Sequence, residues 1–170
     1  MTDVNEVVAR RAWIASMLRT IAGGIVLGSV ASIPAVAAMP GGASRRIVVY
    51  KDPQCGCCKA WVAHLRANGF QPDAHDRTDM DAMKDSLGVP AALRSCHTAV
   101  AGRFVIEGHV PAADIARLLA RPPKQGVVGL AVPGMPAGSP GMEVARGRSE
   151  RYDVMAFAAD GRTSVFASHG

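Results

Sequence analysis

The sequence predicts a small α/β domain, and three observations support that class. Short β-branched and apolar runs alternate with stretches of helical character, as in folds that pack helices against a sheet. Of the 170 residues, 49% are hydrophobic and only 5% aromatic, which suits one domain with an aliphatic core. Three of the four cysteines, Cys55, Cys57 and Cys58, lie between the first predicted strand and the first predicted helix.

Residues 1–37 have the features of a cleaved export signal. The pair Arg10-Arg11 gives a positively charged start, and residues 21–36 are apolar or small and carry no charge. Ala35-Val36-Ala37 has the A-x-A form that signal peptidase cleaves. We therefore predict a signal peptide that ends there and a mature protein in the periplasm.

Cleavage near Ala37 and Ala38 leaves a flexible lead-in over residues 38–46 and a single domain over residues 47–170. An uncleaved membrane anchor is the alternative, because the charge-free residues 20–39 are about long enough to span a bilayer. That stretch is rich in Gly, Ala and Ser and ends in a cleavage-like site, which favours cleavage. The Arg10-Arg11 pair leaves both Sec and twin-arginine export open.

The charge of the chain gives little support to a nucleic-acid partner. The formal net charge is +5, and it is +4 without the first 37 residues, where 16 Lys and Arg oppose 12 Asp and Glu. The basic residues are scattered, and no aromatic platform lies between them. We expect neither nucleic-acid binding nor membrane association after signal cleavage.

The thiols lie on a turn between a strand and a helix. Ile47–Tyr50 is an apolar run without alternation, which predicts a strand buried on both faces, and Asp52-Pro53 ends it. Lys59–Asn68 has helical character, Gly69 terminates it, and its core candidates are Ala60, Val62, Ala63 and Leu65. Backbone N–H groups at a helix N-terminus favour negative charge, so this position favours the thiolate.

A strand, a helix and a two-stranded hairpin are predicted downstream of this unit. Phe70–His75 is a weaker strand because it contains Pro72, and a helix capped by Thr78 or Asp79 then runs to Leu87. The next two runs, residues 92–100 and 102–108, predict an antiparallel hairpin.

The C-terminal third adds a helix, a loop and a second hairpin. Ala112–Ala120 is the third predicted helix, with Pro111 in its first turn. Residues 126–141 form a Gly- and Pro-rich loop that presents methionines. Beyond it, residues 152–158 and 163–167 flank Asp160-Gly161, which is a hairpin signal.

The order strand, thiol turn, helix, strand, helix, X-Pro, hairpin, helix resembles the thioredoxin and glutaredoxin fold, a βαβαββα core. In that fold, a cis-proline precedes the third strand and faces the thiol turn, and Pro90 stands at that place. The resemblance makes Val89–Pro90 a candidate cis bond, although most X–Pro bonds are trans. The Gly/Pro/Met loop and the last hairpin extend beyond the minimal fold.

Soft metal ligands are concentrated in the mature chain. Thiolate and thioether sulfurs select Cu(I), and the chain offers them at Cys55, Cys57, Cys58, Cys96, Met135 and Met142. Three thiolates within four residues cannot all bind one ion without backbone strain, so bridging sulfurs in a multinuclear cluster fit better. The third strand of such a fold runs beside the thiol turn, which makes Cys96 the candidate fourth sulfur.

Other roles remain open for several of these residues. His97 and His109 are candidate ligands by their place in the order of elements, but a structural role is as reasonable. Met135 and Met142 would otherwise be packing residues. Zinc is the rival metal, although structural zinc sites usually draw their ligands as two separated pairs. Two structural disulfides are a further alternative in an exported protein, but a clustered trio makes an inefficient staple.

The spacing of Cys55 and Cys58 also suggests a second class of function. C-x-x-C at a thioredoxin-like turn is the spacing of thiol–disulfide oxidoreductases, in which Cys55 would be the attacking thiolate and Cys58 the resolving thiol. Cys57 counts against this reading, because a third thiol between the pair invites misdirected exchange.

Four motifs in order resemble the CopG family of periplasmic copper-resistance proteins. They are residues 50–61 with Cys55-Gly56-Cys57-Cys58, residues 95–98, residues 105–111, and residues 132–142 with both loop methionines. The resemblance covers essentially the whole mature chain. It implies a thioredoxin-like fold that carries a multinuclear copper–thiolate cluster, with the ligands Cys55, Cys57, Cys58 and Cys96, and with Met135, Met142 and His109 as further ligands.

The same resemblance implies a function and partners. The family is associated with copper tolerance, often beside copper efflux systems, and a redox interconversion of Cu(I) and Cu(II) has been proposed for it. The expected partners are several copper ions per chain and other periplasmic copper-handling or efflux proteins. A copper oxidoreductase activity is the enzymatic form of this expectation.

Overall fold

The computed structural model describes residues 45–123, 126–144 and 149–170. The predicted signal peptide and most of the predicted lead-in lie outside these residues. Within the described ranges, none of the helices has the length and apolar character that a membrane span requires.

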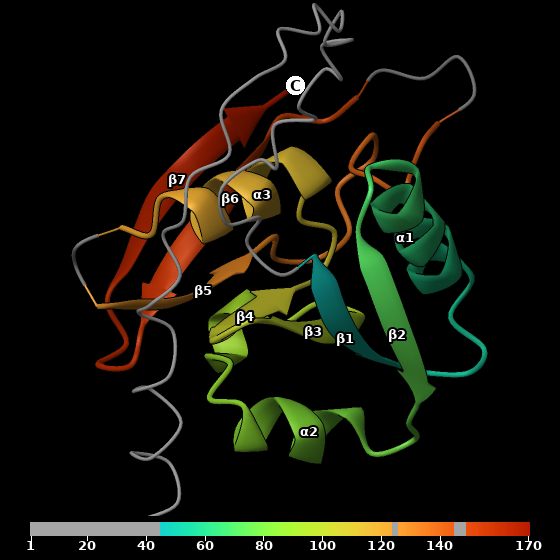
Figure 1. Cartoon of the computed structure of the whole chain (residues 1–170), viewed down its shortest axis with the longest axis horizontal. Helices are drawn as coiled ribbons and strands as arrows, with labels where there is room; N and C mark the ends of the chain where they lie inside the picture. Colours follow the sequence, from blue (N-terminus) through green and yellow to red (C-terminus); the bar gives the residue numbers. More distant parts are fainter. Residues whose placement is uncertain (1–44, 124–125, 145–148) are drawn as a thin grey trace, which may run out of the picture. The chain divides into compact units, whose positions relative to one another are not determined.

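A seven-stranded mixed sheet forms the centre of the domain, with the strand order β2-β1-β3-β4-β5-β6-β7 (Figure 1). Neighbouring strands are antiparallel except for β1 with β2 and β4 with β5, which are parallel. The elements in chain order are β1 (Arg46–Lys51), α1 (Gly56–Ala67), β2 (Gln71–Asp76), α2 (Met80–Ser86), the 3₁₀ turn η2 (Ala91–Leu93), β3 (His97–Ala101), β4 (Phe104–Glu107), α3 (Ala112–Ala120), β5 (Val127–Ala131), β6 (Tyr152–Ala158) and β7 (Thr163–His169).

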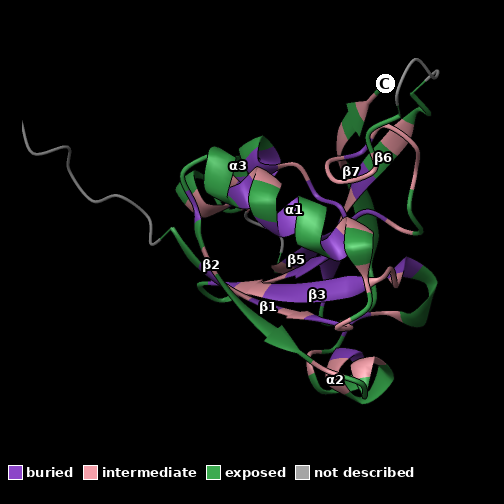
Figure 2. Cartoon of the chain, turned by 90° about the vertical axis from the view of Figure 1, so that its right-hand side faces the viewer, coloured by how far each residue is buried: buried purple, intermediate pink, exposed green. Residues whose placement is uncertain are grey.

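Helices cover both faces of the sheet, with α1 and α3 on one face and α2 on the other (Figure 2). The main core lies under α1 and α3, where Trp61 and Leu65 pack with Ile115 and with strand residues such as Val49 and Ile106. Side chains alternate between the two faces along β3. His97 therefore meets Trp61 on the α1 face, while Thr98 meets Lys84 of α2.

The thioredoxin-like order of elements is confirmed from β1 to α3, and the C-terminal hairpin β6–β7 is confirmed as well. β2 is a strand despite Pro72, because an edge strand tolerates a residue without an N–H. One strand was not predicted. Residues 127–131 form β5 between β4 and β6, so the C-terminal hairpin extends the central sheet.

Two local predictions are wrong. β1 is not buried on both faces: Ile47 and Val49 are buried, while Val48 and Tyr50 between them are half-buried. Ala60 and Ala63 are exposed, because the helix turns its Trp61, Val62 and Leu65 face to the core.

The candidate cis bond Val89–Pro90 is trans, since the described residues contain no cis peptide bond. Pro90 precedes the 3₁₀ turn Ala91–Leu93, and β3 begins only at His97. The segment that reaches the thiol turn is instead Ser95-Cys96, whose Cys96 carbonyl oxygen lies 3.9 Å from the Cys58 sulfur.

Candidate metal centre

The thiols lie in the first turn of α1, which begins at Gly56 rather than at the predicted Lys59. Cys55 is the N-cap residue, and its sulfur accepts a hydrogen bond from the Cys58 backbone N–H at 3.3 Å. A disulfide joins Cys55 and Cys58, whose Cα atoms are 5.3 Å apart. Cys58 is buried under the helix, whereas Cys55 and Cys57 are half-buried. The helix start thus presents one closed pair and one free thiol, Cys57.

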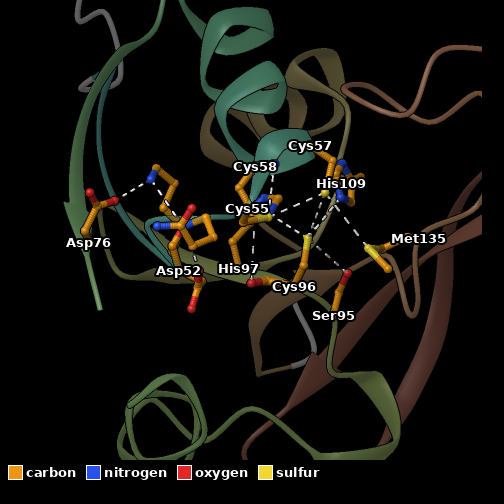
Figure 3. The surroundings of a disulfide bond; sticks show 12 residues. Asp52, Cys55, Cys57, Cys58, Asp76, Ser95, Cys96, His97, His109 and Met135 are labelled. Atoms are coloured by element: carbon orange, nitrogen blue, oxygen red, sulfur yellow. Dashed lines mark hydrogen bonds and ion pairs between the residues drawn. A yellow bond between two sulfur atoms is a disulfide. The ribbon is translucent and has the colours of Figure 1, made fainter. Parts of the chain in front are cut away.

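Cys96 completes a group of four sulfurs, as predicted from the strand order (Figure 3). The Cys57 sulfur lies 3.5 Å from that of Cys55 and 3.9 Å from that of Cys96. The sulfurs of all four cysteines lie within 4.8 Å of one another. Residues that are up to 41 positions apart in the chain therefore share one small volume, because β3 runs beside the strand that leads into the thiol turn.

Two histidines flank the Cys96 sulfur. His109 Nδ1–H donates to the Pro140 carbonyl oxygen at 2.8 Å, so its Nε2 is left as an acceptor 3.1 Å from the Cys96 sulfur. His97 Nδ1 lies 3.2 Å from the same sulfur. One ligand atom each of Cys96, His97 and His109 fall within 4.8 Å of one another. This second grouping shares Cys96 with the four-sulfur group.

Burial dominates the electrostatics of these three residues. Burial, followed by the neighbouring Cys57, raises the pKa of the Cys96 thiol to about 12, so Cys96 holds its proton at neutral pH. Burial also lowers the pKa of His109. It lowers the pKa of His97 well below its usual range, and the positive charge of Lys84, and of His109 when His109 is protonated, acts in the same direction. Both imidazoles are therefore neutral, which is the form that binds metals.

Trp61 and His97 close the inner side of the centre. The two rings lie 4.3 Å apart, both are fully buried, and Trp61 Nε1–H donates to the Val110 carbonyl oxygen at 2.9 Å. His97 Nε2 is the one buried side-chain nitrogen or oxygen that lacks a hydrogen-bond partner among the described residues.

The methionine loop covers the outer side. Met135 is 51% exposed, and its sulfur lies 4.0 Å from that of Cys57. Gly141 touches the first turn of α1 so closely that a Cβ there would lie 2.8 Å from both the Cys57 oxygen and the Trp61 nitrogen. Met142 is half-buried, and its backbone closes the loop through hydrogen bonds with Gly138 and Ser139. The sulfur of Met135 therefore lies beside the cysteine sulfurs, as predicted for a loop methionine.

Four residues near the centre were not singled out from the sequence. Lys84, Thr98 and Glu107 form a buried polar group on the α2 face of the sheet, and Ser95 contacts it from the segment before Cys96. A charged residue at the end of an otherwise apolar run, as in Phe104–Glu107, was the one available signal. Its partner Lys84, which lies on α2, could not be identified from the sequence.

Comparisons with known proteins agree with the fold. Residues 93–142, which include Cys96 and both loop methionines, match the family described as "Protein of unknown function, DUF411". No curated protein matches the chain. A solved structure named copper resistance protein CopG, form 1, has a TM-score of 0.68 and 49% sequence identity, over 73% of this chain and 96% of that chain. Form 2 gives the same score and identity, over 74% and 98%.

Together these findings define a thioredoxin-like protein with a thiol cluster at the start of its first helix. At this identity and coverage, the chain belongs to the CopG family of copper-resistance proteins.

Proposed function

We propose that this chain is a periplasmic copper-resistance protein that holds several Cu(I) ions on the thiolates of Cys55, Cys57, Cys58 and Cys96. The observation that carries the proposal is the convergence of all four cysteine sulfurs within 4.8 Å. Thiolates and thioethers select Cu(I), and Met135 adds a thioether 4.0 Å from the Cys57 sulfur. The name shared by the two solved relatives supports copper as the metal.

Nitrogen donors complete the proposed ligand set. His109 Nε2 and His97 Nδ1 both face the Cys96 sulfur in their neutral forms, so each is available to a metal ion bound there. The predicted ligand Met142 belongs to the same loop as Met135. Zinc is a poorer fit, because this centre places three sulfurs on one helix turn and adds a thioether.

The disulfide gives the centre a redox function as well. Opening the Cys55–Cys58 bond takes up two protons and two electrons, which two Cu(I) ions supply as they become Cu(II), and yields two thiols. In the reverse direction, these two thiols reduce two Cu(II) ions to two Cu(I) ions, form the disulfide and release two protons. In the disulfide form of this couple, Cys57 and Cys96 are the two thiols that remain available to hold copper, so the four-thiolate site belongs to the reduced form. The chain would then interconvert Cu(I) and Cu(II) as a copper oxidoreductase.

Elemental analysis of the mature protein tests the copper proposal. The protein is loaded with Cu(I) under reducing conditions beside a variant in which all four cysteines are serine. We expect several copper ions per chain in the wild type and none in the variant. Copper binding that survives the loss of all four thiols, or a single zinc ion in place of copper, would contradict the proposal.

A second function has one observation in its favour. The Cys55–Cys58 disulfide joins a half-buried sulfur to a buried one, as expected for an attacking and a resolving cysteine of a thiol–disulfide oxidoreductase. Reduction of insulin by the copper-free protein tests this function. A rate no greater than that of free dithiol would exclude it.

The compartment and partners follow from the same reading. An N-terminal signal peptide would deliver the chain to the periplasm, where copper efflux or storage proteins would supply or accept the ions. Fusion of residues 1–37 to a reporter that is active only after export tests this location. Cleavage near Ala37 is the expected result, and an uncleaved, membrane-bound fusion would contradict it.

A further inference from the structure

A buried polar network lies directly behind the Cys96 segment, on the face of the sheet opposite α1. Lys84 of α2 and Glu107 of β4 form an ion pair at 2.6 Å, with 3% and 0% of their surfaces exposed. Thr98 lies opposite Glu107 in the β3–β4 ladder, accepts from Lys84 at 2.8 Å and donates to Glu107 Oε2 at 2.5 Å.

Stability alone is a weak reason for this pair. Removing two charges from water costs so much that apolar replacements of buried ion pairs are often neutral or even stabilising. Unlike an apolar pair, an ion pair provides a carboxylate oxygen that accepts hydrogen bonds in a fixed direction. Glu107 Oε1 accepts from Lys84 and, at 2.6 Å, from the Ser95 backbone N–H.

Ser95 connects the network to two sulfurs of the metal centre. Its backbone N–H is held by Glu107 immediately before Cys96, whose sulfur lies 3.9 Å from that of Cys57. Its hydroxyl donates to the carbonyl oxygen of Gly134, immediately before Met135. One residue thus fixes the main chain next to the fourth thiol and the main chain next to the thioether.

We propose that Lys84, Thr98 and Glu107 are positioning residues, which set the places of Cys96 and Met135 relative to Cys57 by fixing Ser95. This inference rests on the proposed copper function. It extends the metal centre to three residues that act on the sulfurs only through Ser95. The network acts as the outer support of the centre, in the way that groups behind metal ligands orient them.

Two double variants of the mature protein separate positioning from packing. Both replace the buried pair with uncharged side chains of similar size: Lys84→Met with Glu107→Gln, and Lys84→Met with Glu107→Leu. The glutamine keeps an oxygen that accepts from the Ser95 N–H, and the leucine does not. Both variants lose the same two charges, so any general effect of that loss on stability is the same in the two. Thermal unfolding of the metal-free proteins measures this effect.

Cu(I) affinity is then measured by competition with bathocuproine disulfonate under reducing conditions. We expect the glutamine variant to match the wild type and the leucine variant to bind about 10-fold more weakly or worse, as when a supporting residue of a metal ligand is lost. Equal affinities in the two variants would show that the network only packs the core.

A readout without copper keeps this test separate from that of the proposed function. In the oxidised, metal-free protein, Cys57 and Cys96 are the free thiols, and mass spectrometry follows the alkylation of each. We expect faster alkylation of Cys96 in the leucine variant than in the glutamine variant. If the wild type binds no Cu(I), the copper function fails, but a difference in alkylation would still support positioning, and equal rates would refute it.

A double-mutant cycle of Ser95 and Met135 tests the proposal even if the Glu107→Leu variant does not fold. Ser95→Ala removes the hydroxyl that holds the Gly134 carbonyl, and Met135→Leu removes the thioether. If Ser95 acts through Met135, the double variant should bind Cu(I) no more weakly than Met135→Leu alone. Strictly additive losses would overturn this arm of the proposal.

Discussion

Replacing Gly141 with alanine tests whether the methionine loop must lie on the first turn of α1. Gly141 has a φ of +86°, a left-handed conformation that costs an alanine about 1–2 kcal/mol. The added Cβ would also lie 2.8 Å from the Cys57 oxygen and the Trp61 nitrogen, both of which are backbone atoms of the helix. Backbone atoms of a helix cannot rotate away as a side chain can, so the loop would have to move away from α1.

The steric contact of the added Cβ with the helix backbone carries a cost of its own. Overpacking of this kind costs about 1–3 kcal/mol beyond the strain. The neighbouring Pro140 carbonyl would move with the loop, and it accepts the hydrogen bond that orients His109 toward Cys96. We therefore expect Gly141→Ala to lose stability and also to weaken Cu(I) binding by about 10- to 100-fold, as when a ligand's supporting contact is lost.

Gly161→Ala is the matched control. Its φ of +81° imposes the same strain, but nothing lies within 4 Å of its added Cβ, and it sits in the β6–β7 hairpin, away from the thiols. Urea unfolding and Cu(I) competition are measured on both variants. The control should lose only about 1–2 kcal/mol and keep its affinity for copper. Equal losses of stability and affinity in the two variants would refute a role for the loop contact.

The remaining predictions concern the thiols and the buried rings. Cys55→Ser should open the disulfide, leave Cys58 as a thiol and lower the copper content per chain, and an unchanged copper content would exclude Cys55 as a ligand. The pKa of Cys96 is raised in the fold from 9.0 to about 12, so its contribution to stability is complete below pH 9.0 and is lost toward pH 12. Unfolding of the metal-free protein at several pH values should show this loss in the wild type and less of it in Cys96→Ala. The pKa of His97 is lowered below 6.5, so its contribution is present above pH 6.5 and is lost in acid, and His97→Gln should flatten that acid limb. Trp61→Phe leaves the Val110 carbonyl without its donor and should cost about 1–3 kcal/mol in urea unfolding, while an unchanged midpoint would show that water replaces the bond.

The parts of the fold that sequence predicted well are those with strong local signals. Asp160-Gly161 between two apolar runs marks the last hairpin, and the apolar spacing Ala112, Ile115, Leu118 marks α3, whose predicted bounds match the structure. β5 was missed because Gly126 and the Gly/Pro stretch after it predict a loop. Its strand conformation is fixed by pairing with β4 and β6, which is information from distant residues.

The metal centre also has one part that local sequence predicts and one part that depends on distant residues. The clustering of Cys55, Cys57 and Cys58 is a matter of covalent neighbourhood, and any fold that places a helix after them gathers their sulfurs. The approach of Cys96 followed from the order of the strands, which is a weaker but sufficient constraint.

Sequence by itself thus determined the class of fold, the identity of the four thiols and the soft-ligand chemistry that favours copper, because these depend on residue type and short spacing. Only the tertiary structure decided that Cys55 and Cys58 are joined, that Met135 faces Cys57, and that Lys84 and Glu107 pair behind Cys96. The spacing of Cys55 and Cys58 permits the disulfide, but the geometry of the turn decides whether the two sulfurs meet. The other two contacts depend on packing between elements, and a distance across a core is not encoded in any local pattern.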